Sequence, residues 1–346
     1  MTNGSYLKRF IAFLGIAIAS NLVLFEMFGD SSVMIRKEAQ FIRFIFHTEA
    51  AIISRVAAYI HTKAPWLEEV PYAAPDTDTR LSTWYLPPHQ VVAEWMFFIF
   101  VFIGTIAYGR PVARTEPIHL SRSKRLGLFL TFQTCLWTLV AVVYYKFRSW
   151  VQLGEWFAPL YFFQPCHVLL TAYVVLCLII IYSRGESSTA NAVTLFHVLF
   201  DLQWFTWVAI VLPDMQALIE RDFFGEYFLF YFEHVLLVVL PYTMLCFGLA
   251  SATHDTWEGR MFRAWYSLAW FGLHHIQVMT PVSLISGIQI NYQTHLPEYA
   301  MDWFGRAYKP VITGLSLAGI LVFAFAIDPL AKRIYHFFRS RRVKGE

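Results

Sequence analysis

The sequence predicts an all-α, polytopic transmembrane helical bundle of about eight spans plus one interfacial amphipathic helix. Hydrophobic residues make up 57% of the 346 residues, and charged residues make up only 15%. A typical soluble domain has about 45–50% apolar and about 25% charged residues. The chain therefore has too few charges to cover a surface that faces water, and we expect the excess apolar surface to face lipid.

Eight apolar segments are long enough to cross a bilayer, which takes about 20 predominantly apolar residues. They lie at residues 9–28, 91–109, 126–146, 159–182, 191–212, 227–250, 261–283 and 310–331. The first segment follows Lys8 and Arg9 like a signal peptide. Its apolar run continues to Phe25, beyond the small residues at 17–19, which favours an uncleaved anchor.

The segment before residue 85 differs from the rest of the chain. Residues 33–61 have apolar positions facing basic ones, a pattern typical of a helix that lies in the membrane interface. A proline-rich stretch follows and predicts an irregular loop. We therefore divide the chain into residues 1–84, which hold the anchor span, the interfacial helix and this loop, and residues 85–346, a seven-span bundle with a basic tail.

Basic residues cluster in two places beside apolar spans, at residues 110–125 and 332–344. Loops rich in Lys and Arg next to membrane spans face the cytoplasm. With eight spans, this rule predicts that both termini are cytoplasmic. The loop at 29–90 then faces the lumen or the exterior.

The fourth span contains the strongest local motif, Gln164-Pro165-Cys166-His167. Proline has no N–H and suits the first turn of a helix, so we expect a regular helix to begin here. Cys166 would then lie near free backbone N–H groups, which favour the nucleophilic thiolate. The alternative is a structural thiol that packs beside a proline kink.

His234 in the sixth span is a candidate base for that thiol. Cys166 is seven residues past residue 159, and His234 is seven past Tyr227. At about 1.5 Å per residue both lie roughly 10 Å deep in the membrane. A nucleophile and its base must come within hydrogen-bond reach, and equal depth is necessary for that. A purely structural hydrogen bond of His234 is the alternative.

The other ionisable residues in the spans are weaker candidates. His275 in the seventh span lies at about the same depth as Cys166, whereas His167 should point away from its neighbour on a helix. His197 and Asp201 suit a binding or structural role better. The remaining thiols, expected to be small core residues, are Cys135, Cys177 and Cys246.

Several classes of site have no motif in this chain. The sequence has no Gly-x-Ser-x-Gly elbow, no phosphate-binding loop and no paired histidine–carboxylate metal motif. Its four cysteines have no spacing typical of a disulfide framework or a zinc site. We therefore expect neither a cofactor nor a bound metal, and the basic clusters are read as membrane anchors with no nucleic-acid partner.

Four short motifs follow one another in the order of a known family. Two are Lys146-Phe147 followed by Gln164-Pro165-Cys166-His167-Val168, for which the family has Asn-Pro-Cys-His-Val, and Glu233-His234-Val235 with Leu240-Pro241-Tyr242. The others run from His275 to Gln289-Ile290-Asn291 and from Asp328 to Lys332. Over roughly residues 85–340 the chain resembles the transmembrane protein 164 family of membrane acyltransferases. Glu233 stands where the family has a glutamine.

The resemblance implies an O-acyltransferase that acts on phospholipids through a thioester intermediate. Cys166 would be the nucleophile and His234 the general base. Family members are associated with moving polyunsaturated acyl chains onto lyso-ether phospholipids, which implies phospholipid and lysophospholipid partners and the endoplasmic reticulum as the location. We further expect His275 or Asn291 to orient His234 or to donate a hydrogen bond to the oxyanion.

Two alternatives remain at this level. The same Cys166–His234 pair would make a lipid hydrolase if water were the acceptor, because acceptor choice depends on whether the cavity excludes water. A non-enzymatic lipid transporter or scramblase would keep Cys166 as a structural residue.

Overall fold

A computed structural model describes residues 98–105, 120–154, 158–182, 186–211, 213, 224–249, 257–280, 282–283 and 308–344. The described residues are helical and contain no strand. This confirms the all-helical class. The expected span at 9–28, the interfacial helix and the division at residue 84 lie outside the described residues, as does Asn291.

Five stretches of the described residues are helical, long and apolar enough to cross a membrane. They are Arg122–Leu153, Pro165–Tyr182, Ala192–Val211, Gly225–Phe247 and Val311–Phe338. Each matches one of the eight expected spans. The expected span at 261–283 forms as α10, Trp257–Gly272, continued by the π-helix η4, Leu273–Met279, and is not one of the five. The chain is a multi-pass membrane protein, and a count of eight is not established.

Two of the expected spans are not single regular helices. The fourth span begins with the 3₁₀ helix η2, Ala158–Phe163, and becomes regular only in α5, Pro165–Tyr182. The fifth is broken into α6, Glu186–Asp201, and α7, Trp204–Val211. The helix therefore does restart at the proline, as the motif predicted.

The remaining described helices are longer than expected or contain π-helical segments. The helix α4, Arg122–Leu153, is longer than expected, and α9, Phe224–Met244, continues into the π-helix η3, Leu245–Leu249. The last span consists of α13, Tyr308–Val322, the π-helix η6, Phe323–Ile327, and α14, Asp328–Lys344. The basic tail is thus helical as far as Lys344.

The chain divides into two compact units. The first holds Met1–Tyr108 and Ala269–Gly314, and the second holds Gly109–Leu268 and Leu315–Glu346. In the first unit, the described helix at 98–105 packs on the residues around Gly272. There the ring of Phe102 meets that of Trp270 edge to face at 5.6 Å.

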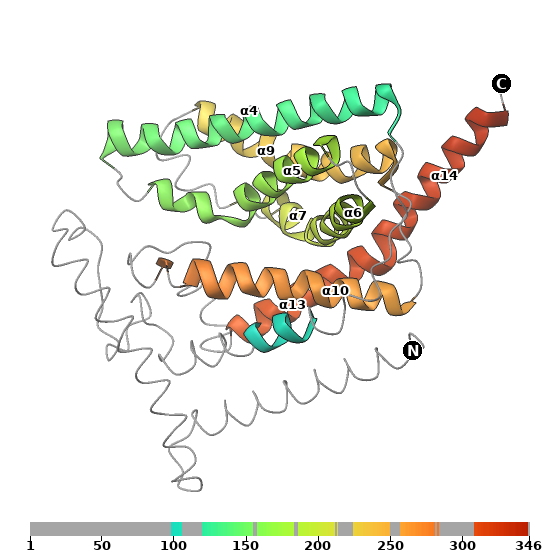
Figure 1. Cartoon of the computed structure of the whole chain (residues 1–346). Helices are drawn as coiled ribbons and strands as arrows, with labels where there is room; N and C mark the ends of the chain where they lie inside the picture. The colour runs from blue at the N-terminus through green and yellow to red at the C-terminus, as the bar shows by residue number, and fades with distance from the viewer. Residues whose placement is uncertain are drawn as a thin grey trace, which may run out of the picture. The chain divides into compact units, whose positions relative to one another are not determined.

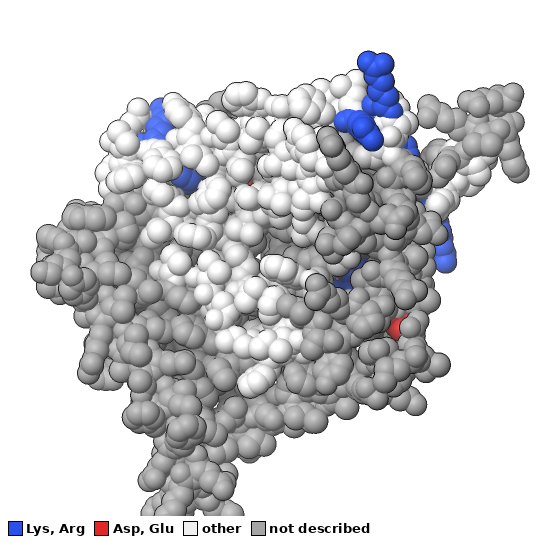
Figure 2. Space-filling model, in the orientation of Figure 1, with Lys and Arg blue, Asp and Glu red and all other residues white. Residues whose placement is uncertain are grey.

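The core of the second unit lies where α5 packs against α4, α6 and α9 (Figure 1). Its buried apolar side chains include Leu128, Leu170, Tyr173, Phe196 and Leu237. The opposite face of α4 leaves Trp137 and Tyr144 exposed. Figure 2 shows a broad uncharged face with Lys and Arg near its edges, as expected of helices that meet lipid.

Candidate active site

Cys166 lies in the first turn of α5, directly after Pro165, and is half-buried. The Val168 N–H donates to the Gln164 carbonyl at 3.1 Å. The backbone N–H groups of Cys166 and His167 come before this bond in the first turn of the helix. N–H groups in that turn have no acceptor within the helix. The thiol therefore lies at the positive end of α5, where negative charge is stabilised.

His234 lies in the middle of α9 and is buried. Its Nδ1 is 2.7 Å from the carbonyl oxygen of Phe230, one turn earlier. A carbonyl only accepts, so this Nδ1 carries the hydrogen and Nε2 is the ring's proton acceptor. The side chain of His234 also lies near enough to the Cys166 thiol to interact with it electrostatically. The fold therefore brings together Cys166 and His234, the two residues that we expected at equal depth in the membrane.

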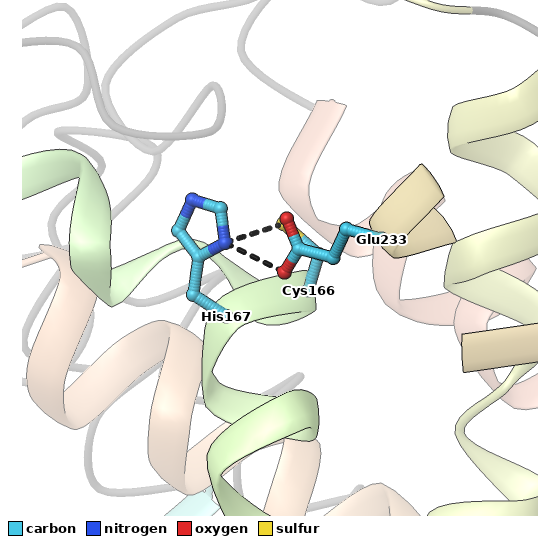
Figure 3. Close-up of side chains that lie close together, drawn as sticks. All are labelled: Cys166, His167 and Glu233. Atoms are coloured by element: carbon cyan, nitrogen blue, oxygen red, sulfur yellow. Dashed lines mark hydrogen bonds and ion pairs between the residues drawn. The ribbon is translucent and has the colours of Figure 1, made fainter. Parts of the chain in front are cut away.

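His167 also reaches the thiol, and our expectation that it points away is wrong. Its Nδ1 is 3.6 Å from the Cys166 Sγ and 2.8 Å from the Glu233 Oε1 (Figure 3). Neighbours on a helix diverge at their Cβ atoms, but Glu233 and Phe162 hold the imidazole so that its Nδ1 lies near the sulfur. The Phe162 ring stacks on His167 at 6.0 Å.

Glu233 is a site residue that the sequence did not reveal. It is only 1% exposed and comes from α9, 66 residues away from the histidine that it binds. The carboxylate accepts the Nδ1 hydrogen of His167, which fixes that ring's tautomer. The only sequence signal was its glutamate identity beside His234 in an apolar span, where an ionisable residue is costly.

This arrangement can activate a thiol. His234 offers a proton acceptor, and the polar His167–Glu233 pair lies beside the sulfur. The residues come from two helices that contact each other, α5 and α9, so their spacing is fixed by helix packing. Nucleophilic attack on an acyl carbonyl is the chemistry that such a thiol performs.

The same cluster offers metal ligands. One ligand atom each of Cys166, His167 and Glu233 lies within 4.8 Å of the other two. A sulfur, an imidazole nitrogen and a carboxylate oxygen are the three ligand types that zinc takes in proteins. No spacing rule predicts this set, because one ligand is far from the other two in sequence.

His275 belongs to the other compact unit, and its expected role beside His234 stays a prediction. His275 lies in η4 of the first unit and is buried, with its Nδ1 3.2 Å from the Phe271 carbonyl. Cys166 and His234 belong to the second unit. Within the second unit the site brings together Cys166, His167, Glu233 and His234.

The other cysteines divide by exposure. Cys135 and Cys177 are fully buried, which confirms the expectation of core residues. Cys246 is exposed, and its assignment to the core is wrong. It lies in η3, after Pro241, where the wider π-helical turn changes which positions face outward.

His197 and Asp201 lie in a second polar cluster, away from the thiol. Arg263 in α10 contacts Asp201 and Asp328 with nitrogen–oxygen distances of 2.7 Å each, and its Nη1 is 3.2 Å from His197. Lys332 is 3.1 Å from Asp328. These interactions fit the structural role that the sequence suggested for the two residues.

Comparison with known proteins supports the resemblance. No family model matches the chain, and no solved structure matches it. Over 145 residues it is 28% identical to the Transmembrane protein 164 homolog of Dictyostelium discoideum. The chain is similar to a transmembrane protein 164 homologue. The matched region is 42% of this chain and 47% of that protein, so the chain spans about half the length of the relative.

Proposed function

We propose that the chain is a membrane-embedded acyltransferase that moves fatty acyl chains between phospholipids. The observation that supports this function best is the proximity of the Cys166 thiol to His234, whose Nδ1 hydrogen is held by the Phe230 carbonyl. The resemblance to the transmembrane protein 164 family supplies the substrate class. It indicates that the acyl acceptors are lyso-ether phospholipids.

In the first half of the reaction His234 Nε2 takes the thiol proton while the sulfur attacks the carbonyl carbon of a phospholipid ester. The intermediate collapses, the ester C–O bond breaks, and the leaving lysolipid oxygen takes the proton from His234. The product is a thioester on Cys166. Glu233 holds the His167 ring in place beside the sulfur throughout the reaction.

In the second half His234 takes the proton of an acceptor lysolipid hydroxyl, whose oxygen attacks the thioester carbonyl. The C–S bond breaks, and the thiolate recovers the proton from His234. Among the described residues, the first-turn amides of Cys166 and His167 are suited to hold the oxyanion, a role that the sequence also suggests for His275 or Asn291. Substrates enter sideways from the bilayer, with both termini of the chain on the cytoplasmic side of the endoplasmic reticulum.

The test uses the purified full chain in lipid nanodiscs that contain a phospholipid with a labelled acyl chain. With added lysophospholipid we expect label in the acceptor, and without it a labelled protein adduct that hydroxylamine releases. Cys166→Ala should abolish both signals. Cys177→Ala is the matched control, because Cys177 is a buried thiol on the same helix outside the site. Release of free fatty acid alone would overturn the transferase and leave the hydrolase.

A further inference from the structure

The three side chains in Figure 3 converge from two helices on one point. Cys166 and His167 are consecutive residues in the first turn of α5, and Glu233 comes from α9. Their ligand atoms lie within 4.8 Å of one another before any metal is bound. A cation that binds there would meet a site whose ligands are already positioned.

The distances suit a tetrahedral zinc ion. With Zn–S of about 2.3 Å, Zn–N of about 2.0–2.1 Å and tetrahedral angles, sulfur and nitrogen ligands lie about 3.6 Å apart. The observed Sγ–Nδ1 distance is 3.6 Å. The Nδ1–Oε1 distance is 2.8 Å, against about 3.3 Å for two ligands of one zinc ion, so this pair must open by about half an ångström.

Charge also favours a divalent cation. Glu233 is 1% exposed, and an uncompensated carboxylate in an apolar span is costly. Zinc(II) bound by one thiolate, one carboxylate and a neutral imidazole gives a site with no net charge. The ion therefore removes the cost of burying Glu233.

The protons can be accounted for as well. When Nδ1 of His167 becomes a ligand, its hydrogen must move to Nε2, which is buried and has no hydrogen-bond partner among the described residues. The histidine then changes tautomer without changing charge. Only the thiol proton is released to solvent, as thiolate ligation requires.

We propose that Cys166, His167 and Glu233 form a Zn²⁺ site in which the metal occupies the Cys166 sulfur and blocks its reactivity. Three protein ligands leave a fourth position open to water, so binding is weaker and more reversible than at a closed four-ligand site. This inference rests on the ligand geometry and not on acyl transfer.

The test uses the full chain in nanodiscs, stripped of metal by a chelator and free of any histidine tag. Co²⁺ should bind at one ion per chain with a thiolate-to-cobalt charge-transfer band, and Zn²⁺ should displace it. In a Cys246→Ala background, which removes the exposed thiol, Zn²⁺ should slow alkylation of Cys166 by at least about tenfold. Chelation should restore the rate.

Variants locate the site. Cys166→Ser should abolish the charge-transfer band, and Glu233→Gln should weaken Zn²⁺ binding by about 10- to 100-fold or more, because even indirect partners of a metal cost that much. The matched control is Glu226→Gln, a buried glutamate on the same helix that pairs with Lys146 at 2.9 Å. It should bind Zn²⁺ like the parent.

Two results would overturn the site: no stoichiometric metal, or binding that survives both Cys166→Ser and Glu233→Gln. Acyl transfer is measured separately in the chelated protein. A chain that binds Zn²⁺ without transferring acyl groups refutes the proposed function alone, and one that transfers without binding Zn²⁺ refutes this inference alone.

Discussion

At the scale of single residues, the site depends on which atom of each histidine carries the hydrogen. The Phe230 carbonyl fixes Nδ1–H of His234, and the Glu233 carboxylate fixes Nδ1–H of His167. Nε2 of His234 is thereby left as a proton acceptor, whereas the His167 hydrogen is held by the carboxylate and that ring lies beside the sulfur. Two histidines near one thiol therefore have different tasks because their second partners differ.

Glu233→Ala should slow alkylation of Cys166 by about 10- to 100-fold, because a hydrogen bond to a charged group is worth about 1.5–3 kcal/mol. Without the carboxylate the His167 ring loses its tautomer and its orientation toward the thiolate. Glu233→Gln keeps an acceptor oxygen and should recover part of the rate. The rate of iodoacetamide reaction, measured against pH in metal-free protein lacking Cys246, checks this. Equal rates in all three proteins would contradict the role of Glu233.

His234→Ala should lower acyl transfer by about 10²–10⁴-fold, the usual contribution of a positioned general base. The folded state should persist, because the Phe230 carbonyl that loses its partner still accepts the backbone bond of its helix. Transfer of labelled acyl chains, normalised to protein that remains monodisperse in nanodiscs, measures the effect. A variant with parental activity would remove His234 from the mechanism.

At the scale of elements, small residues allow helices to approach each other closely. Gly319 in the last span is such a contact, because a Cβ added there would lie 2.7 Å from the Trp204 ring of α7. Gly314 on the same helix has no atom of the described residues within 4 Å of the corresponding position. The two glycines therefore differ in the space that the described residues leave for a methyl group.

Gly319→Ala should lower the free energy of unfolding by about 1–3 kcal/mol, because the indole must move to admit the methyl group. Gly314→Ala should be neutral or raise it by up to about 1 kcal/mol, since alanine has the higher helix propensity. Thermal unfolding in one detergent compares the two. Equal losses would show that helix propensity, rather than contact with Trp204, controls both positions.

A second element-scale effect concerns the end of α4. Gly154 closes this helix with φ of 72°, a left-handed conformation that costs residues with a Cβ about 1–2 kcal/mol. Gly154→Ala should destabilise the chain by that amount even though no atom of the described residues lies within 4 Å of the new methyl group. Gly154→Asn should lose less, because asparagine tolerates this conformation. The midpoint of thermal unfolding measures both, and identical losses would contradict the conformational cause.

At the scale of the whole molecule, the second unit contains a buried charge cluster that joins helices distant in sequence. Arg263 binds carboxylates from α6 and α14, and Lys332 completes the balance of two positive and two negative charges. Asp201 and Asp328 are fully buried. Removing one partner of such a network leaves an uncompensated charge in a low-dielectric interior.

Arg263→Met should therefore destabilise the second unit by about 3–5 kcal/mol. The double change Arg263→Met with Asp201→Asn restores the charge balance and should recover a substantial part of that loss. Unfolding of the parent, each single variant and the double variant in the same detergent gives the coupling energy of the pair. Additive losses in the double variant would show that charge balance is not what the cluster provides.

Much of the fold could be predicted because helices in lipid are local structures. Each must satisfy its own backbone hydrogen bonds, so apolar length alone locates the segments. The restart of α5 at Pro165 followed from the missing proline N–H. The breaks within the other spans did not follow, because π-helical segments and the gap between α6 and α7 depend on neighbouring helices.

The sequence by itself determined that this is a multi-pass helical membrane protein, and it identified Cys166 and His234 as residues of equal depth. Only the tertiary structure decided that Glu233 turns His167 back toward the thiol, and that Arg263 neutralises Asp201. The physical reason is that depth and periodicity follow from positions along one helix. Rotation about the helix axis, and hence which side chains meet, is set by packing between helices.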